Sequence, residues 1–516
     1  MKHNTQTTAW QQYEAGKEYK RRIGLYERVH TNERFYRGDQ WSQSDYDLPR
    51  PVFNVVRRIT DYLVGAVLPE DVSIHYVDDK LPFLESSVLR ETVQKGLCLL
   101  ERNASYRWKQ NHMNALAYQA LLNAALTGDG IFYCYWDDQV TGGQPYLGDI
   151  RVDCIDNTAL FVADVDQPEL QRQDYVMLAG RAPVTSLRRE ALEAGLSHAE
   201  AQRITADDTT TDDLLSSVST PDVEGAEKAT YLLRFFRENG EVICEKSTKT
   251  CVLRRFNTGL RHYPVAYFNW IPTKNCFHGT SPISDIIANQ KFINGAYAMA
   301  MKHMRDTAFS KVIYDKSRIP EWSNEVGEAI AANGGGSVAD AISVVGVGKM
   351  QDGYLALLNN VIENTKAMMG ATESALGDAE ANNTSAILAL QEASRVGLAQ
   401  VTRQFCRCIG ELATIWADMI CTYCPNERLL PILAEDGVRA ERADYRRLRD
   451  ELISAVAEVG KTTRYTPAST VLVLDKLLEG GYLELSQYLR LLPPGSIAGR
   501  EQLIQEIQNK GALENE

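Results

Sequence analysis

The chain has 516 residues, of which 44% are hydrophobic and 24% charged, and its formal net charge is −13. The composition is close to that of an ordinary soluble protein, and the length predicts about three to five domains or lobes at roughly 100–200 residues each. The acidic balance argues against a simple basic protein that coats DNA, because such a protein needs a surplus of Lys and Arg to neutralise phosphates, but it does not exclude a protein past which DNA slides.

No apolar run approaches the roughly 18–20 residues of a membrane-spanning helix, so we expect no membrane partner. The first residues, MKHNTQTTAW, lack the apolar segment of a secretory signal, which indicates a protein made in a reducing cytoplasm. Ten cysteines in a chain of this length are too dilute for a disulfide scaffold.

The first half of the chain mixes helical and strand patterns, which predicts an α+β fold with antiparallel hairpins. Helical patterns cover residues 9–30, 49–69, 82–127 and 184–204. Stretches rich in aromatic and β-branched residues predict strands at 72–77, 131–136, 149–155, 159–164, 174–180, 230–238, 241–246, 250–256 and 263–271.

Two connecting segments stand out in this half. Residues 205–228 hold seven acidic residues against one lysine, which predicts a mobile surface loop. The sequence TGDG at 127–130 is interpreted as the end of a helix followed by a turn, where glycine supplies the special backbone angles.

The second half begins with a long helix and a small module. Residues 279–306 have helical spacing, with Ser281 as a cap and Pro282 in the first turn. The module that follows is expected to contain strands at 309–314 and 341–347 and a helix after Pro320.

Three further segments complete the pattern. The spacing of apolar residues predicts another helix at 351–369, and a loop of small and polar residues, ALGDAEANNTSAI, follows at 375–387. Residues 385–424 predict one long helix with a wide apolar face, which Pro425 ends. From 426 to 516 we expect charged helices with sharp turns.

Catalytic motifs are missing from the sequence. GVGKM at 346–350 lacks the first Gly and the Ser or Thr of a nucleotide-binding loop, and neither H-E-x-x-H nor G-x-S-x-G occurs. We therefore expect neither an ATPase nor another enzyme, and no cofactor. Adjacent Asp137 and Asp138 could bind a metal in a nuclease, but they are expected to be ordinary turn residues. His303, on the polar side of its helix, is expected to be solvated or between subunits.

Four cysteines raise the alternative of a zinc site: Cys406, Cys408, Cys421 and Cys424. Cys406 and Cys421 would lie four turns apart on one helix, about 22 Å, so a single ion could not bind both. We expect these cysteines to be small apolar residues and expect no metal.

The order of these features resembles the portal, or head–tail connector, protein of tailed bacteriophages. The resemblance covers nearly the whole chain and depends on several stretches in this order, none of which is a catalytic signature. They are NERFYRGDQW (32–41), PVFNVVRRITDYLVG (51–65), YPVAYFNWIPTKNCFHGTSPISDIIANQKFIN (263–294) and ATESALGDAEANNTSAILALQEASR (371–395).

The resemblance implies a portal-type α+β fold and a division of the chain by role. It implies a wing (1–278), a first stem helix (279–306), a small αβ clip (307–350), a second stem helix (351–370), a tunnel loop (371–385), a long wing helix (386–425) and a helical crown (426–516).

The resemblance also implies a function in the virion. Such proteins form a ring, usually of twelve copies, at one capsid vertex, through which double-stranded DNA is packaged and ejected. The implied partners are the major capsid protein, the terminase large subunit and the head–tail adaptor, with assembly in the host cytoplasm. A metal-dependent DNA-processing enzyme and another ring-forming virion connector remain alternatives.

The implied DNA-facing residues lie in the tunnel loop: Asp378, Glu380, Asn382, Asn383, Thr384 and Ser385. A plain surface connection between two helices is the alternative for this loop. Four basic residues on and just beyond the first stem helix could touch DNA or pair with neighbouring subunits, and the two options stay open: Lys291, Lys302, Arg305 and Lys311.

Overall fold

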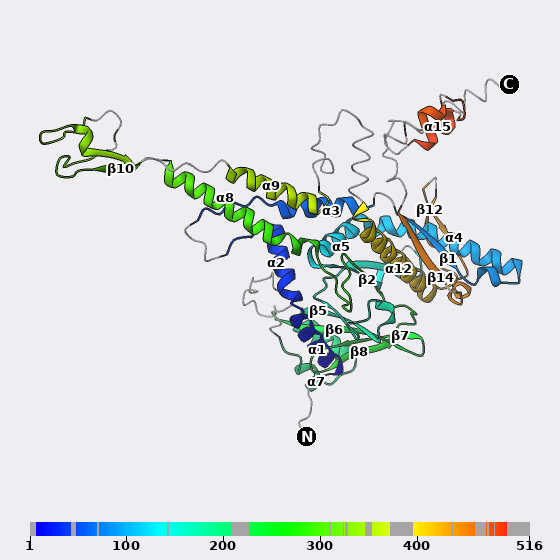
Figure 1. Cartoon of the computed structure of the whole chain (residues 1–516). Coiled ribbons are helices and arrows are strands. Elements are labelled where there is room, and N and C mark those ends of the chain that lie inside the picture. The colour runs from blue at the N-terminus through cyan, green and yellow to red at the C-terminus, as the bar shows by residue number, and fades with distance from the viewer. Residues whose placement is uncertain are drawn as a thin grey trace.

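The computed structural model describes residues 7–492 except 43–47, 70–71, 142–143, 208–226, 309–310, 324, 326–328, 346–352, 372–395, 435–436, 452, 460–470, 472–473, 479 and 484. Figure 1 shows a body that contains most of the helices and sheets and a pair of helices, α8 and α9, that projects from it. The mixture of helices with antiparallel sheets confirms the α+β class.

Helices of the first half begin and end at special backbone positions. Gly24, with φ at 67°, divides the predicted helix of 9–30 into α1 (Thr8–Arg22) and α2 (Leu25–Arg37). His112, with φ at 51°, likewise divides the pattern of 82–127 into α4 (Ser87–Gln110) and α5 (Met113–Thr127). Asn54 caps α3 (Val55–Val67), and α6 (Val184–Glu193) and α7 (His198–Gln202) follow later in the chain.

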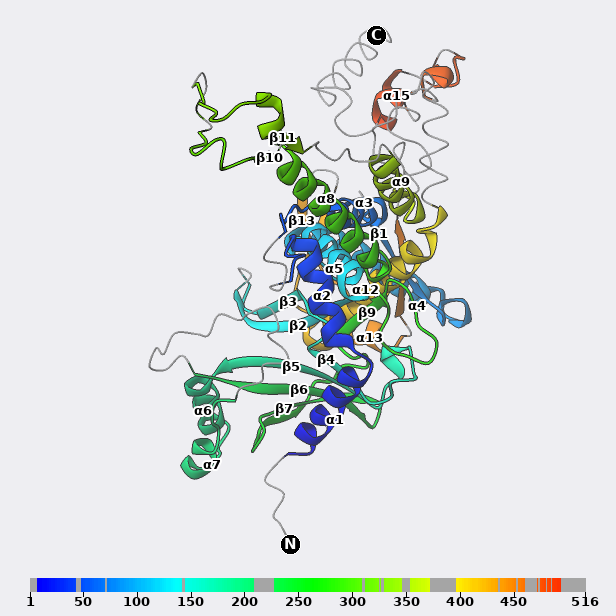
Figure 2. The same cartoon turned by 60° about the vertical axis from the view of Figure 1, so that its left-hand side comes forward.

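All predicted strands of the first half are present, and they pair antiparallel as expected. One sheet has the order β3 (Leu147–Cys154), β2 (Asp129–Thr141), β9 (Val265–Asn269). The other has the order β4 (Leu160–Val162), β5 (Tyr175–Pro183), β6 (Lys228–Glu238), β7 (Glu241–Ser247), β8 (Val252–Asn257). Figure 2 shows α1 beside the second sheet and α6 and α7 at one end of it.

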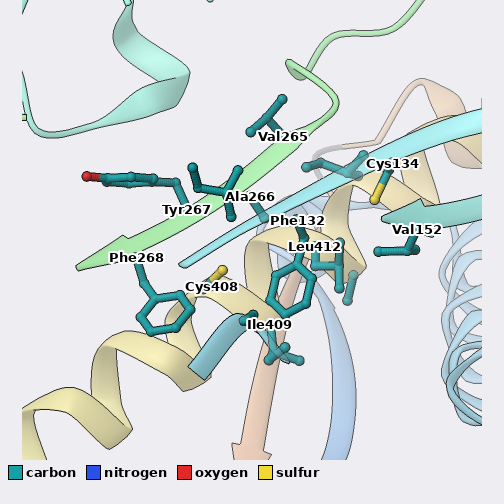
Figure 3. Close-up of a cluster of buried hydrophobic side chains, with 14 of the residues drawn as sticks. Phe132, Cys134, Val152, Val265, Ala266, Tyr267, Phe268, Cys408, Ile409 and Leu412 are labelled. Atoms are coloured by element: carbon teal, nitrogen blue, oxygen red, sulfur yellow. The ribbon is translucent and has the colours of Figure 1, made fainter. Parts of the chain in front are cut away.

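The centre of the body is α12 (Ala399–Tyr423), which packs against β9 and against β14 (Ile453–Val459). Its buried residues form two adjacent stripes, each with alternating steps of three and four: one from Val401 to Met419 and the other from Ile409 to Ile420. Phe405 meets Phe268 of β9 edge to face, with 5.5 Å between the ring centroids. Figure 3 shows Phe132 and Phe268 from the strands against the face of α12 that carries Cys408, Ile409 and Leu412.

The projection consists of two helices with a small hairpin at its far end (Figure 1). A 3₁₀ turn, η3 (Pro282–Asp285), leads into α8 (Ile287–Thr307), and the Ser281 hydroxyl accepts a hydrogen bond from the Ile283 N–H at 3.1 Å. At the tip, β10 (Lys311–Tyr314) pairs with β11 (Ile342–Val345), which follows η4 (Val338–Ala341). The return helix is α9 (Gly353–Met368).

The prediction of a helix after Pro320 is wrong for the residues that the structure describes between β10 and β11. Only the short η4 is helical there, and only Ile319 and Ala341 bury apolar side chains in that stretch. A short helix without an apolar face to bury against a neighbour is not stable in water, which explains its absence.

The prediction that residues 426–516 are helical is wrong for most of 430–459. This stretch contains β12 (Leu430–Ala434), β13 (Gly437–Glu441) and β14, with the short α13 (Tyr445–Arg449) between them. Leu430 and Ile432 alternate inward, and β14 finds its partner in β1 (Val72–Asp78), far away in the sequence. Farther on, the described residues include α15 (Leu485–Leu491).

The long helix expected over 386–425 is described only in part. Residues 386–395 lie outside the described residues, and Gly397 and Leu398 form a turn before α12 begins. The predicted acidic loop of 205–228 also lies mostly outside the described residues.

The projection leaves the body where two glycines touch. Gly128, at φ 103°, ends α5, and Gly279 lies just before η3. A Cβ on Gly128 would come within 2.5 Å of the Gly279 carbonyl oxygen, and a Cβ on Gly279 within 2.6 Å of the Gly128 carbonyl oxygen. Since both obstacles are backbone atoms, neither residue tolerates a side chain.

We expect Gly279→Ala to lower the free energy of unfolding by about 1–3 kcal/mol, because the added methyl group forces the two backbones apart. Gly295→Ala on α8 is the control, since its Cβ would meet no atom within 4 Å and alanine favours a helix by up to about 1 kcal/mol. Urea unfolding of both variants measures the difference. Equal stabilities would contradict the proposed close contact.

Candidate functional site

The projecting pair is held together by a narrow seam. Ile293 and Ala296 of α8 bury themselves against Leu358 of α9. Two hydrogen bonds cross the seam, from the Tyr354 hydroxyl to the Ala296 carbonyl at 2.7 Å and from Asn289 Nδ2 to Thr365 Oγ1 at 3.0 Å. A seam of this width leaves most of both helices facing outward.

Large apolar side chains lie on the outward faces of the pair. Six of them are between 47% and 70% exposed: Phe292, Met299, Met304, Leu355, Leu357 and Met368. At about 100° per residue, Leu357 and Met368 share one flank of α9, whereas Leu355 lies on the opposite flank. These side chains leave apolar surface on both flanks of α9 that a neighbouring molecule could cover.

A buried polar network fixes α8 to α3. Gln290, which is almost fully buried, accepts hydrogen bonds from the Val55 and Val56 N–H groups at 3.0 and 3.2 Å and donates to the Phe53 carbonyl at 2.9 Å. Asn294 donates to Gln40 Oε1 at 2.6 Å. At about 100° per residue both amides fall between Ile287 and Ile293 on the apolar side of α8, which was the signal in the sequence that could have found them.

The predicted basic residues of α8 share one face. At about 100° per residue, Lys291, Lys302 and Arg305 fall within roughly 60° of one another, opposite the seam with α9. Arg305 lies 3.5 Å from Asp306, and the Lys291 ammonium lies over the Phe35 ring at 5.7 Å. Lys311 is in β10 rather than on the helix, opposite Val345.

The predicted tunnel-loop residues cannot be placed in this geometry. Asp378, Glu380, Asn382, Asn383, Thr384 and Ser385 lie outside the described residues. His303 is partly exposed on α8, and its carbonyl accepts a hydrogen bond from the Thr307 hydroxyl at 2.6 Å.

A buried carboxylate lies beside the two touching glycines, within the TGDG sequence that was interpreted only as a turn. Asp129 is completely buried, and five donor groups lie within hydrogen-bonding distance of its oxygens. They are Tyr267 Oη at 2.8 Å, Asn269 Nδ2 at 3.2 Å, the Gly279 N–H at 2.8 Å, His278 Nδ1 at 2.8 Å and Asn157 Nδ2 at 3.0 Å.

His278 is buried with Asp129. Burial lowers the pKa of His278 more than the neighbouring carboxylate raises it, and the charges of Lys20 and Arg28 lower it further. A neutral imidazole with its proton on Nδ1 would donate to Asp129, which fits the acceptor-only carboxylate.

Of the four predicted cysteines, Cys408, Cys421 and Cys424 lie in the apolar core and Cys406 is half-buried. Cys408 and Cys421 are buried, and burial raises the pKa of both thiols, which disfavours the thiolate that binds metals. Among the described residues, no three His, Cys, Asp or Glu side chains form a group that could hold a metal ion.

Asp137 and Asp138 are strand residues rather than turn residues. Both lie within β2, at the point where its pairing with β3 becomes irregular. Asp137 accepts a hydrogen bond from the Gln139 N–H at 3.1 Å, and Asp138 accepts one from Gln139 Nε2 at 2.9 Å. The strand was predicted to end at residue 136, whereas β2 continues to Thr141, so both carboxylates fall within it.

A comparison with known protein families matches part of the chain. Residues 241–450 match the family of phage P22-like portal proteins, a span from β7 through the projection and α12 to α13. No curated protein matches the chain. In the described part of the chain, no helix is both long and apolar enough to cross a membrane. Over residues 241–450 the match confirms the resemblance seen in the sequence, and it supports a tailed-phage portal protein.

Proposed function

We propose that the chain forms a ring at one vertex of a phage capsid, with the projecting helix pairs around a central channel for double-stranded DNA. The ring would hold twelve copies and serve both packaging and ejection of the genome. The observation that carries the proposal is the apolar side chains on opposite flanks of α9, because head-to-tail contacts in a closed ring need two different surfaces on each copy.

Each part of the chain has a role in this proposal. Residues 1–278 are the wing, 279–306 and 351–370 the stem helices, and 307–350 the clip. Residues 371–385 are the tunnel loop, 386–425 the long wing helix and 426–516 the crown, of which 430–459 contains strands. The clip would receive the terminase large subunit and later the head–tail adaptor, and the wing would contact the major capsid protein.

The charge of the chain supports passage of DNA rather than tight binding. Each copy contributes a formal charge of −13, so a ring of copies is strongly acidic, which reduces attraction to a phosphate backbone. The basic face of α8 would touch DNA or acidic groups of a neighbouring copy. The role is structural, and a separate ATPase would supply the energy of packaging.

We expect the purified protein to have a mass near twelve times 57.7 kDa and to appear as rings with a central channel. Native mass measurement and negative-stain imaging would show both properties. A strictly monomeric protein at micromolar concentration in several salts would overturn the ring.

The double substitution Leu357→Glu and Met368→Glu should prevent ring formation, because two carboxylates would be buried at the proposed contact without partners. The chain should still fold, since both side chains are exposed in the single copy. Ala356→Glu is the control, with a carboxylate on an exposed position of α9 that lies about 100° from both Leu357 and Leu355. Normal assembly of the double variant would show that Leu357 and Met368 do not lie at the contact between copies.

Replacing Asn382, Asn383 and Thr384 with Ala should change the length or retention of packaged DNA. After Leu376 the segment up to Ser385 has no large apolar residue, so little core should be lost. Exposed substitutions usually stay within about 0.5 kcal/mol, although Thr384 could cap the next helix at a cost of about 1 kcal/mol. Packaging and retention assays measure the effect.

Two outcomes would refute the role of the loop. A triple variant that packages and retains DNA normally would make the segment a plain connection. A triple variant that fails to assemble would place it in the folded core.

A further inference from the structure

The segment that leads from the body into the projection is fixed at every residue from Phe277 to Ser281. The Phe277 N–H donates to the Val165 carbonyl at 2.7 Å, and Asn269 Nδ2 donates to the Phe277 carbonyl at 2.9 Å. The Thr280 N–H donates to the Ile271 carbonyl at 2.8 Å, and the Ser281 hydroxyl to the Ala125 carbonyl at 2.6 Å. Between these positions, His278 and Gly279 both bind Asp129.

Asp129 is the point where this segment meets the body. Of its five donors, Asn157 comes from the connection after β3, and Tyr267 and Asn269 come from β9. The remaining two, His278 and Gly279, belong to the segment that enters η3 and α8. The carboxylate therefore joins two parts of the body to the beginning of the projection.

A carboxylate suits this position because it only accepts hydrogen bonds and can accept several at once. Its buried charge has a buried counterpart nearby. Lys20 is 1% exposed and donates to the carbonyls of Asn157 and Thr158, both at 2.7 Å, while the Asn157 amide donates to Asp129. Lys20 also lies over the Phe161 ring at 3.6 Å.

The surrounding contacts leave the segment little freedom to shift. Tyr267 stacks on Phe277, with 4.3 Å between the ring centroids and 18° between the planes. The Gly128–Gly279 contact prevents the segment from moving toward α5. A change at Asp129 would release the two donors of the segment while the apolar contacts of the body stay in place.

We propose that Asp129 is a positioning residue whose buried carboxylate fixes residues 277–281 and thereby the direction in which α8 and α9 leave the body. In an assembled ring the same joint would set the tilt of the helix pairs around the channel, and this consequence alone rests on the proposed function. The joint itself is a property of a single chain.

The first test is hydrogen exchange in Asp129→Asn. The amide keeps the shape of the side chain, but its NH₂ group replaces one of the two oxygens that accept hydrogen bonds from the five donors. Amides of residues 277–290 should exchange at least tenfold faster, with the amides of α12 unchanged. Asp418→Asn is the matched control, because this buried carboxylate accepts hydrogen bonds from the Arg261 and His262 N–H groups and has none to the segment 277–281. In the control, amide exchange should become faster near residues 261–262 and stay unchanged in residues 277–290.

The second test measures direction and not only local stability. Spin labels on Cys98, an exposed cysteine of α4, and on an Asn360→Cys variant of α9 would report the distance between body and projection. Dilution with unlabelled chain restricts the signal to pairs within one copy, and chain without Asn360→Cys gives the background. Asp129→Asn should at least double the width of the distance distribution, whereas Asp418→Asn should leave it unchanged.

Either of two results would overturn the proposal: exchange in 277–290 within twofold of the unsubstituted chain, or an unchanged distance distribution. If Asp129→Asn fails to fold, Tyr267→Phe replaces it. This substitution keeps the ring on Phe277 but removes a hydroxyl that lies 2.8 Å from Asp129 and 2.6 Å from the Phe277 carbonyl, so exchange should rise severalfold in the same residues. A chain that forms no rings but shows these effects would refute the proposed function and retain the joint.

Discussion

The burial of α12 is the constraint on which the rest of the body depends. This helix carries two adjacent apolar stripes, so it can be covered only from more than one side. The sheet containing β2 and β9 covers one side, and the strand pair β1–β14 covers another, as their contacts show. Strands from the beginning, middle and end of the chain are brought together because they share this one helix.

The projection is held by a different kind of interaction. Its root uses buried polar groups, Asp129 on one side and Gln290 on the other, instead of a large apolar surface. Hydrogen bonds depend strongly on direction, whereas apolar contacts do not, so a polar root defines an orientation more sharply than apolar packing of the same size would. The body thus gains stability from α12, and the projection gains its direction from a few buried polar side chains.

The apolar residues on the outer flanks of α8 and α9 contrast with this polar root. Exposed apolar side chains also occur on the body, for example Phe83 and Val88, but those of the projection lie on two helices that share only a narrow apolar seam. A surface of this kind is costly for a single chain and becomes favourable once a neighbour covers it. This contrast, together with the match to the portal family over residues 241–450, is the basis for the proposed ring.

The sequence by itself determined the elements whose pattern is local. The nine strands of the first half, the apolar stripes of α12 and the helical spacing of α8 and α9 all follow from repeats of two or of about 3.6 residues, which need no knowledge of distant partners. Only the tertiary structure decided the features that depend on partners far along the chain. Residues 453–459 become a strand because β1 pairs with them across more than 350 positions. The described residues between Pro320 and η4 form no helix, because they bury no apolar face. In the same way, the local sequence TGDG indicates only a turn, and Asp129 becomes a buried acceptor because residues 277–279 pack beside it in the folded chain. Burial and pairing of a polar group are properties of the folded chain and not of its local sequence.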